Sequence, residues 1–365
     1  MRKSQHEYFT RKALELAIKA KGKTSPNPLV GAVVVKNNRI IGSGYHKKAG
    51  LVHAEVEALR QAGRRAQGST LYVSLEPCCF FGRTPPCTDA IINSGIKKVI
   101  IGMCDPNPKN NGRGIKILRH EGISVKEGYL QNELKKINEH FIKYISKKIP
   151  FVTIKVGQSL DGKIATKTGD SEWITSYSAR SYAKSLRADY DAIMLGINTV
   201  INDDPELAAP EKKRFFKIVV DPHLRIPLKS QIIRKNSKSV IIATGLNSST
   251  YKKKALEKLG VKIIKVPSRL KNLNLRYLLS KLASLEITSV LVEGGGRMIG
   301  SLLEQHLVDK VLFFIAPKII GGESAISSVM GKGIRKIKNA IKLDNIKLKQ
   351  IGSDYLFEAY IKSIA

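Results

Sequence analysis

The chain is short of cysteine, of acidic residues and of long hydrophobic runs, and each shortage excludes a class of protein. Its four cysteines are too few to build the disulfide framework that is typical of small secreted proteins. No stretch approaches the roughly 20 apolar residues of a membrane-spanning helix. No apolar run follows the first charges, as a signal peptide would require. We therefore expect a cytoplasmic protein that has no membrane partner.

The shortage of acidic residues leaves 30 Asp and Glu against 63 Lys and Arg, a formal net charge of +33. Such an excess attracts polyanions, including nucleic acids. The lysines are scattered through both halves, however, and no basic stripe is interleaved with the aromatic residues on which single-stranded bases stack. We predict no specific nucleic-acid partner and a small phosphate-bearing substrate. A nucleic-acid base deaminase is the alternative, and steeply salt-dependent binding to single strands would identify it.

The four cysteines include two that pair with a histidine in a pattern typical of metal sites. His53, Cys78 and Cys87 offer one nitrogen and two sulfurs, the ligand set of a catalytic zinc whose fourth position is left for water. Glu55 follows the histidine too closely to be a fourth ligand, and we predict that it is the catalytic residue that carries protons. His-x-Glu followed by Pro-Cys and a further Cys is the signature of zinc deaminases.

The remaining cysteines leave one alternative open. Cys87 follows two prolines and should begin a helix, whose dipole favours its thiolate. Cys79 could replace Cys78 as a ligand, although a structural role is the simpler interpretation. Cys104 ends an apolar strand and is predicted to be a buried structural thiol.

Predicted helices and strands alternate along the chain, which indicates α/β domains. At 365 residues the chain exceeds an ordinary single domain, and its predicted junction gives domains 1–148 and 149–365. The predicted helices are 6–20, 53–63, 114–122, 132–147, 179–186, 275–284 and 298–305. The predicted strands are 31–35, 39–45, 71–75, 98–104, 124–128, 151–157, 192–196, 217–220, 240–244, 261–266, 289–292 and 310–315.

A glycine-rich turn lies between the last predicted strand–helix pair. Glycines 294–296 allow close approach of the backbone, and free amides at the start of the following helix can hold a phosphate. Residue 299 is Ile, so the turn lacks the third glycine of a full dinucleotide-binding fingerprint. By itself, the turn is equally compatible with simple chain reversal.

Several sequence runs together resemble the family of bifunctional riboflavin-pathway deaminase–reductases. In the first half these runs are 24–31, 53–55, 76–78, 82–87 and 105–108. In the second half they are 155–163, 171–175, 186–188, 203–205 and 293–295. The resemblance covers nearly the whole chain. It implies a cytidine-deaminase-like α/β/α N-terminal domain and a dihydrofolate-reductase-like α/β C-terminal domain.

The resemblance also implies two consecutive reactions and two cofactors, zinc and NADPH. The first is hydrolytic removal of the amine of 2,5-diamino-6-hydroxy-4-(5-phosphoribosylamino)pyrimidine, and the second is reduction of its ribosyl group to ribityl. It leaves a homo-oligomer open. The implied NADPH contacts are Gly157, Trp173, Thr199, Asp203, Gly295, Gly296, Arg297, Met298, Ile299, Gly300 and Ser301. The implied substrate contacts are Ser171, Arg187, Leu207 and Glu293, with Arg187 suited to bidentate binding of phosphate.

The chain departs from the family pattern at a few positions. Cys79 and Phe80 replace Ser-His, Lys184 stands where His is common, and Asn110-Asn111 replaces a small apolar pair without clear consequence. Pro210 replaces a phosphate-binding arginine, for which Lys212, Lys213 or Arg214 could substitute. The departures keep two alternatives open: a homologue with one active domain, and a non-catalytic basic scaffold that would lack stoichiometric zinc.

Overall fold

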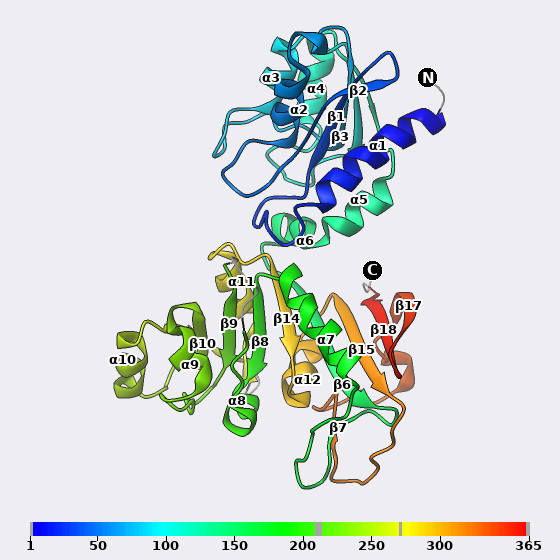
Figure 1. Ribbon diagram of the computed structural model, residues 1–365. Coiled ribbons are helices and arrows are strands. Elements are labelled where there is room, and N and C mark those ends of the chain that lie inside the picture. Colours follow the sequence, from blue (N-terminus) through cyan, green and yellow to red (C-terminus); the bar gives the residue numbers. More distant parts are fainter. Residues whose placement is uncertain (1–2, 209–213, 270–271, 363–365) are drawn as a thin grey trace. The chain divides into compact units, whose positions relative to one another are not determined.

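The computed structural model describes residues 3–208, 214–269 and 272–362. The chain divides into two compact units, Met1–Lys148 and Ile149–Ala365 (Figure 1). None of the helices in the described ranges combines the length and the apolar character that crossing a membrane requires.

The first unit is built on a five-stranded sheet with the order β2-β1-β3-β4-β5. β1 runs antiparallel to β2 and β3, whereas β3, β4 and β5 are parallel. Asn37 and Asn38 both have positive φ and form the tight turn between the first two strands, a conformation that asparagine tolerates well. The strands are β1 (Gly31–Lys36), β2 (Arg39–Tyr45), β3 (Thr70–Leu75), β4 (Lys98–Met103) and β5 (Ser124–Glu127).

Helices cover both faces of this sheet, and glycines in the strands let two of them approach closely. A Cβ atom on Gly31 would lie 2.1 Å from the carbonyl oxygen of Ala13, and one on Gly42 would lie 2.2 Å from that of Ala58. The close contact at Gly42 positions the helix that follows His53. The helices are α1 (Lys3–Ile18), α2 (Ala54–Ala62), α3 (Cys87–Asn93), α4 (Arg113–His120), α5 (Gln131–Ile137) and α6 (Glu139–Lys147), with a short 3₁₀ helix, η1 (Gly63–Ala66).

The prediction of a single helix over 132–147 was wrong, because the chain breaks at Asn138 into α5 and α6. Asn138 is buried, its side-chain oxygen accepts the N–H of Leu29 at 2.8 Å, and its amide donates to the Leu29 carbonyl at 3.1 Å. This link to a residue 109 positions away leaves no trace in local periodicity.

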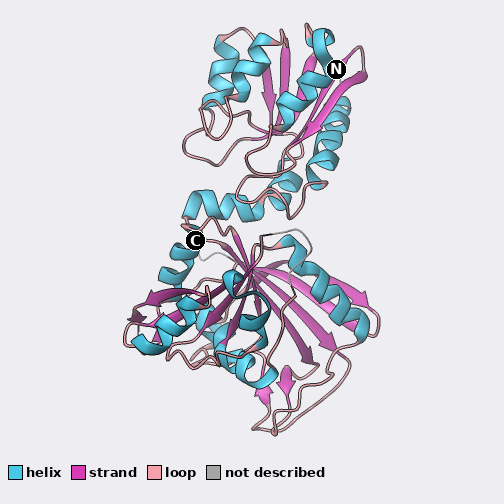
Figure 2. Cartoon of the chain, turned by 60° about the vertical axis from the view of Figure 1, so that its left-hand side comes forward, coloured by secondary structure: helices cyan, strands magenta, loops and turns pink. Residues whose placement is uncertain are grey.

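The second unit is built on a nine-stranded sheet with the order β11-β10-β9-β8-β14-β6-β15-β18-β17. Figure 2 shows the strands in magenta with helices beside them. The strands from β11 to β15 in this order are parallel, and β18 and β17 add an antiparallel hairpin. The strands are β6 (Phe151–Ser159), β8 (Ala192–Gly196), β9 (Phe216–Val220), β10 (Val240–Gly245), β11 (Lys262–Val266), β14 (Ser289–Glu293), β15 (Lys310–Ala316), β17 (Leu343–Ile351) and β18 (Asp354–Ile361). Short pairs are β7 (Lys163–Ala165) with β16 (Ile326–Ser327), and β12 (Ser268–Arg269) with β13 (Asn272–Leu273).

The parallel order places three chain segments at one edge of the sheet. β14 lies between β8 and β6, so the carboxyl ends of these strands are neighbours. Ligands of open α/β sheets bind at such an edge. The helices are α7 (Tyr177–Ser185), α8 (Ile197–Asp203), α9 (Gln231–Asn236), α10 (Thr250–Lys258), α11 (Leu275–Ala283) and α12 (Gly296–Glu304), with 3₁₀ helices η2 (Leu186–Asp189), η3 (Ser237–Ser239) and η4 (Ile337–Asn339).

Candidate active sites

The first unit brings together the three predicted metal ligands. His53 immediately precedes α2, Cys78 lies in the loop after β3, and Cys87 is the first residue of α3. Their ligand atoms all lie within 4.8 Å of one another. The Nδ1 atom of His53 is 3.2 Å from the sulfur of Cys87 and 3.5 Å from that of Cys78. One imidazole and two sulfurs at this spacing fit the donor preferences of zinc.

The start of α3 places a backbone N–H group beside the sulfur of Cys78. The backbone N–H of Cys87 donates to the sulfur of Cys78 at 3.4 Å. The hydrogen bond from the Cys87 thiol, together with those from His53 and this amide, lowers the pKa of Cys78. The same hydrogen bond and then burial raise the pKa of Cys87. The amide of Cys87 thus points to the sulfur of Cys78, and the thiolate predicted for Cys87 stays a prediction.

Glu55 lies in the first turn of α2 and is only 3% exposed. Burial, and then the charge of Cys78, raise the pKa of its carboxyl group to about 7. Its carboxyl group also shares a hydrogen bond with the Cys87 thiol. Glu57, on the same helix, instead pairs with Lys47 at 2.6 Å. The carboxyl group of Glu55 is therefore enclosed beside the three ligand atoms, whereas that of Glu57 lies outside the site.

Two residues lie against His53 that were given no role in the prediction from sequence. The hydroxyl oxygen of Thr84 is 3.2 Å from Nε2, and a hydrogen bond there leaves Nδ1 free to face the sulfurs. His46 is buried, and its ring lies 5.2 Å from that of His53, centroid to centroid. Burial lowers the pKa of His46, whose Nε2 lies 3.0 Å from the side-chain nitrogen of Asn27. The only signal for Thr84 was its place in the run 82–87.

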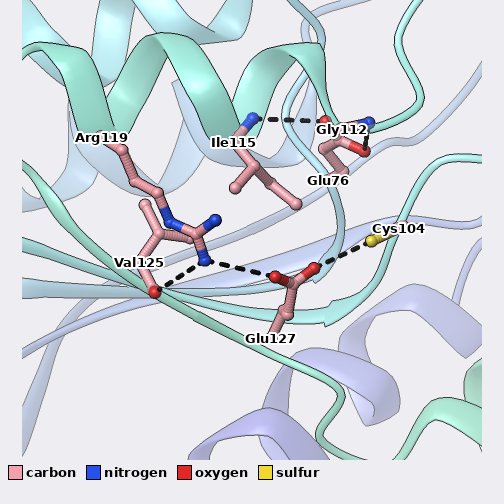
Figure 3. A network of polar contacts seen from close by, with 7 residues as sticks. All are labelled: Glu76, Cys104, Gly112, Ile115, Arg119, Val125 and Glu127. Atoms are coloured by element: carbon pink, nitrogen blue, oxygen red, sulfur yellow. Dashed lines mark hydrogen bonds and ion pairs between the residues drawn. The ribbon is translucent and has the colours of Figure 1, made fainter.

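A buried carboxylate, Glu76, joins the loop of Cys78 to helix α4 (Figure 3). It accepts the backbone N–H groups of Gly112 at 2.9 Å and Ile115 at 3.3 Å, and so caps a helix whose N-cap residue is glycine. A Cβ atom on Gly114 would lie 2.3 Å from the carbonyl oxygen of Pro77. Glycine at this position therefore permits the close approach.

Cys104, which Figure 3 also shows, is half-buried rather than fully buried as predicted. Its thiol donates to the carboxylate of Glu127 at 3.0 Å, and Arg119 donates to the same carboxylate at 3.2 Å. Burial, and then this hydrogen bond, raise the pKa of Cys104 to about 12. The protonated thiol therefore serves as a hydrogen-bond donor.

Asn110, one of the departures without apparent consequence, has a clear structural role. It is fully buried, and its oxygen accepts the backbone N–H of Cys79 at 3.1 Å. Its amide group donates to the Pro77 carbonyl and to the Asp105 carboxylate, both at 3.2 Å. It therefore fixes the chain on both sides of Cys78.

We expect Asn110→Ala to lower the free energy of unfolding by about 1–3 kcal/mol, because it leaves buried polar partners unpaired. It should also weaken zinc retention. The matched control is Asn111→Ala, because Asn111 is exposed and an exposed substitution changes stability by about 0.5 kcal/mol or less. Calorimetry and chelator competition measure both effects, and equal behaviour of the two variants would contradict the role given to Asn110.

The second unit places Glu293 at the end of β14, within an ion cluster. Arg187 donates to its carboxylate through Nε at 2.9 Å and through Nη2 at 3.0 Å, and the ammonium group of Lys155 lies 3.2 Å away. Burial would raise the pKa of Glu293, but Lys155 and Arg187 outweigh it and hold the pKa at about 2. Two guanidinium nitrogens of Arg187 thus bind Glu293, and the predicted contact of Arg187 with the substrate stays a prediction.

A cavity of about 140 Å³ lies beside this cluster. Three of the predicted contacts, Gly157, Arg187 and Glu293, meet in its wall. The lining is completed by Lys155, Thr175, Ala179, Arg180, Ala183, Lys184 and Phe314.

Thr199 and the glycine-rich turn form a second group of predicted contacts. Gly294 and Gly295 have φ of 90° and 80°, which glycine adopts freely. The hydroxyl oxygen of Thr199 lies 3.5 Å from the Cβ position of Gly294 and 3.8 Å from that of Gly295. Gly295 is the N-cap residue of α12, which has no side-chain cap. The backbone amides at this helix start fit a phosphate of NADPH.

The remainder of this predicted stretch faces inward. Met298 and Ile299 belong to the hydrophobic core. A Cβ atom on Gly300 would lie 1.5 Å from the carbonyl oxygen of Met330, and Ser301 accepts a hydrogen bond from Gln305 at 3.3 Å. A Cβ atom on Gly296 would lie 2.3 Å from the carbonyl oxygen of Ser327, whereas Arg297 is exposed. Contacts of NADPH with residues 298–301 remain a prediction, and for Met298 and Ile299 the buried side chains leave only backbone groups.

The other predicted contacts of the second unit lie outside the cavity wall. Trp173 is 61% exposed, and its ring is stacked by the guanidinium of Arg180 at 4.1 Å. Burial, and then the charge of Glu172, raise the pKa of Asp203. Ser171 is exposed and Leu207 is buried. Their roles remain predictions.

Of the three residues proposed to replace the missing arginine, one lies within the described residues. Pro210, Lys212 and Lys213 lie outside the described residues. Arg214 is described; it donates to the carbonyl of Leu285 at 3.3 Å and lies 4.0 Å from Glu286. It does not line the cavity.

The fold and the donor set define the class of the protein, a zinc-type deaminase unit followed by an α/β unit with a ligand site at the carboxyl edge of its parallel strands. The family model described as "Cytidine and deoxycytidylate deaminase zinc-binding region" matches residues 3–103. The model "RibD C-terminal domain" matches residues 150–357. The chain therefore belongs to the RibD family of riboflavin biosynthesis proteins.

Full-length relatives and solved structures support this membership. The riboflavin biosynthesis protein RibD of Aquifex aeolicus is 46% identical over 95% of this chain and 96% of its own length. Acinetobacter baumannii RibD superposes with a TM-score of 0.88 at 34% identity, covering 99% of both chains. A Thermotoga maritima protein superposes with a TM-score of 0.83 at 36% identity, covering 98% of this chain and 99% of that one; it is named diaminohydroxyphosphoribosylaminopyrimidine deaminase/5-amino-6-(5-phosphoribosylamino)uracil reductase.

Membership confirms the predicted class of enzyme and the predicted fold. The protein is a bifunctional riboflavin biosynthesis enzyme with a deaminase and a reductase domain, and its cofactors are zinc and NADPH. Its substrate is a small pyrimidine. The roles of individual residues stay predictions.

Proposed function

We propose that the first unit removes the amine of 2,5-diamino-6-hydroxy-4-(5-phosphoribosylamino)pyrimidine by hydrolysis, and that the second reduces the ribosyl group of the product to ribityl. The name of the Thermotoga maritima structure supports this substrate pair. The observation that carries the proposal is the convergence of His53, Cys78 and Cys87 beside the buried carboxylate of Glu55.

In the deaminase unit, His53, Cys78 and Cys87 would hold the zinc. When bound, zinc supplies a water molecule that loses a proton near neutral pH. Glu55 accepts a proton from the attacking water and delivers it to the leaving amine, as its position beside the three ligands allows. Thr84 orients His53 through Nε2, so that Nδ1 faces the ligand site.

In the reductase unit, NADPH supplies the hydride when bound. The backbone of the turn at Gly294 and Gly295, together with Thr199, is suited to hold a phosphate of this cofactor. Trp173 and Asp203 remain the proposed contacts at its edge. Glu293 orients Arg187 toward the substrate pocket, which the two residues line together with Gly157.

Two broader predictions accompany this function. A cytoplasmic location is supported by four free cysteines, which a reducing compartment preserves. A homo-oligomer and the lack of a specific nucleic-acid partner also remain predictions.

Metal analysis combined with two assays tests the proposal. We expect one zinc ion per chain, ammonia release from the phosphoribosyl pyrimidine, and NADPH oxidation when the deaminated product is supplied. Removal of zinc by a chelator should abolish ammonia release and leave NADPH oxidation intact, because the two sites lie in different units. Ammonia release at the full rate from zinc-free protein would contradict the assignment.

A further inference from the structure

The reductase cavity carries an excess of positive charge. Its lining contains four cationic side chains, Lys155, Arg180, Lys184 and Arg187, and a single carboxylate, Glu293. That carboxylate already pairs with two of the four cations. Such a concentration of like charge in a concave site attracts an anion.

Three of the four cations are held by other groups. Arg187 and Lys155 bind Glu293. The guanidinium of Arg180 stacks on Trp173 and donates to the carbonyl of Thr175. Within the ranges that the structure describes, the ammonium group of Lys184 has neither an ion-pair partner nor a hydrogen-bond partner. The unused charge in the cavity wall is therefore that of Lys184.

Along the chain, Lys184 also lies between Arg180 and Arg187. Arg180 precedes it by four residues and Arg187 follows it by three, the spacing that places side chains on one helical face. The cavity of about 140 Å³ is smaller than the roughly 300–1,000 Å³ of pockets that enclose a whole drug-sized ligand. It is therefore suited to one part of the substrate.

We propose that Lys184 binds the phosphate group of the substrate in the reductase site, an inference that rests on the function proposed above. Arg214 faces Leu285 and Glu286 and does not line the cavity. Lys184, on the helix α7, therefore supplies the point charge for the phosphate in this cavity.

The experiment compares four full-length proteins: wild type, Lys184→Ala, Lys184→Arg and Lys254→Ala. Lys254 is the control, because it is an exposed lysine on the helix α10 and is absent from the cavity wall. Binding of ribose 5-phosphate and of ribose is measured by calorimetry at low salt. Reductase KM and kcat are measured with the phosphoribosyl substrate and with its dephosphorylated form, and ammonia release by the same proteins reports on folding.

Lys184→Ala should weaken ribose 5-phosphate binding and raise KM for the phosphorylated substrate about ten- to hundredfold, the range for loss of a charge-assisted hydrogen bond. Lys184→Arg should restore most of both, and kcat, ribose binding and the dephosphorylated substrate should respond little. Equal binding of ribose 5-phosphate by wild type and Lys184→Ala, or an equal loss for both substrate forms, overturns the proposal.

The reductase assignment and the phosphate site can be refuted separately. Wild-type protein that does not reduce the phosphoribosyl substrate, but loses ribose 5-phosphate binding on Lys184→Ala, would refute the reductase assignment and keep the phosphate site. Wild-type protein that reduces this substrate, with Lys184→Ala unchanged in KM and binding, would refute the phosphate site alone.

Discussion

Glu55→Gln should lower the rate of ammonia release by about 10²–10⁴-fold, the contribution typical of a positioned general acid–base group. Glutamine has nearly the shape of glutamate but cannot accept the proton of the attacking water or return it to the leaving amine. Glu55 is buried beside the metal ligands and offers the carboxylate that the site encloses, so a replacement group is not at hand. Zinc content should remain at the wild-type value, because the three proposed ligands are intact.

Glu57→Gln is the matched control for this experiment. Glu57 lies on the same helix, two residues further along, but its carboxylate pairs with Lys47 at 2.6 Å. Its loss should leave ammonia release within about twofold of wild type, since half-exposed ion pairs contribute little to structure. NADPH oxidation with the deaminated product serves as the second control in both variants. Full ammonia release by zinc-loaded Glu55→Gln would refute the proton-transfer role.

The metal site could be predicted from sequence because its chemistry depends on a few residue types at fixed spacing. His53, Cys78 and Cys87 converge as the pattern required. The hydrogen bond from the amide of Cys87 to the sulfur of Cys78 could not be predicted, because it depends on how the loop and the start of the helix meet in space. Thr84 and Asn110 were missed for a related reason: a hydroxyl or an amide becomes informative only when its partners are known in space.

Helices and strands could be predicted where their own buried residues set the sequence pattern. They could be predicted less well where contacts with distant residues determine the local structure. The buried strands β1 and β8 have the predicted starts and end at or within one residue of the predicted positions. The hairpin of β17 and β18 was not predicted; β17 is an edge strand without a buried residue and gives a weak pattern. The break at Asn138 followed from its link to Leu29. In the second unit the ion pair of Arg187 with Glu293 was not predicted, because the two residues are 106 positions apart.

The ion cluster around Glu293 leads to a second large effect. Arg187→Ala should destabilise the second unit by about 3–5 kcal/mol, the range for removing one partner of a buried ion pair. The side chains of Arg187 and Glu293 are 14% and 11% exposed, so solvent screens the remaining charge poorly. Reductase kcat/KM should fall at least about a hundredfold, since two charge-assisted hydrogen bonds and a cavity wall residue are lost. Calorimetry and NADPH oxidation measure the two effects, and ammonia release should be retained.

The double variant Arg187→Met with Glu293→Gln separates stability from function. Removing both charges eliminates the unpaired buried carboxylate, and replacing a buried ion pair by neutral groups of similar volume is often neutral for stability. The double variant should therefore regain most of the stability lost in Arg187→Ala while its reductase activity stays low. Arg187→Lys should fall in between, because a single ammonium cannot reproduce both hydrogen bonds of the guanidinium fork. Recovery of reductase activity together with stability would show that the pair acts only as scaffolding, with no part in binding the substrate.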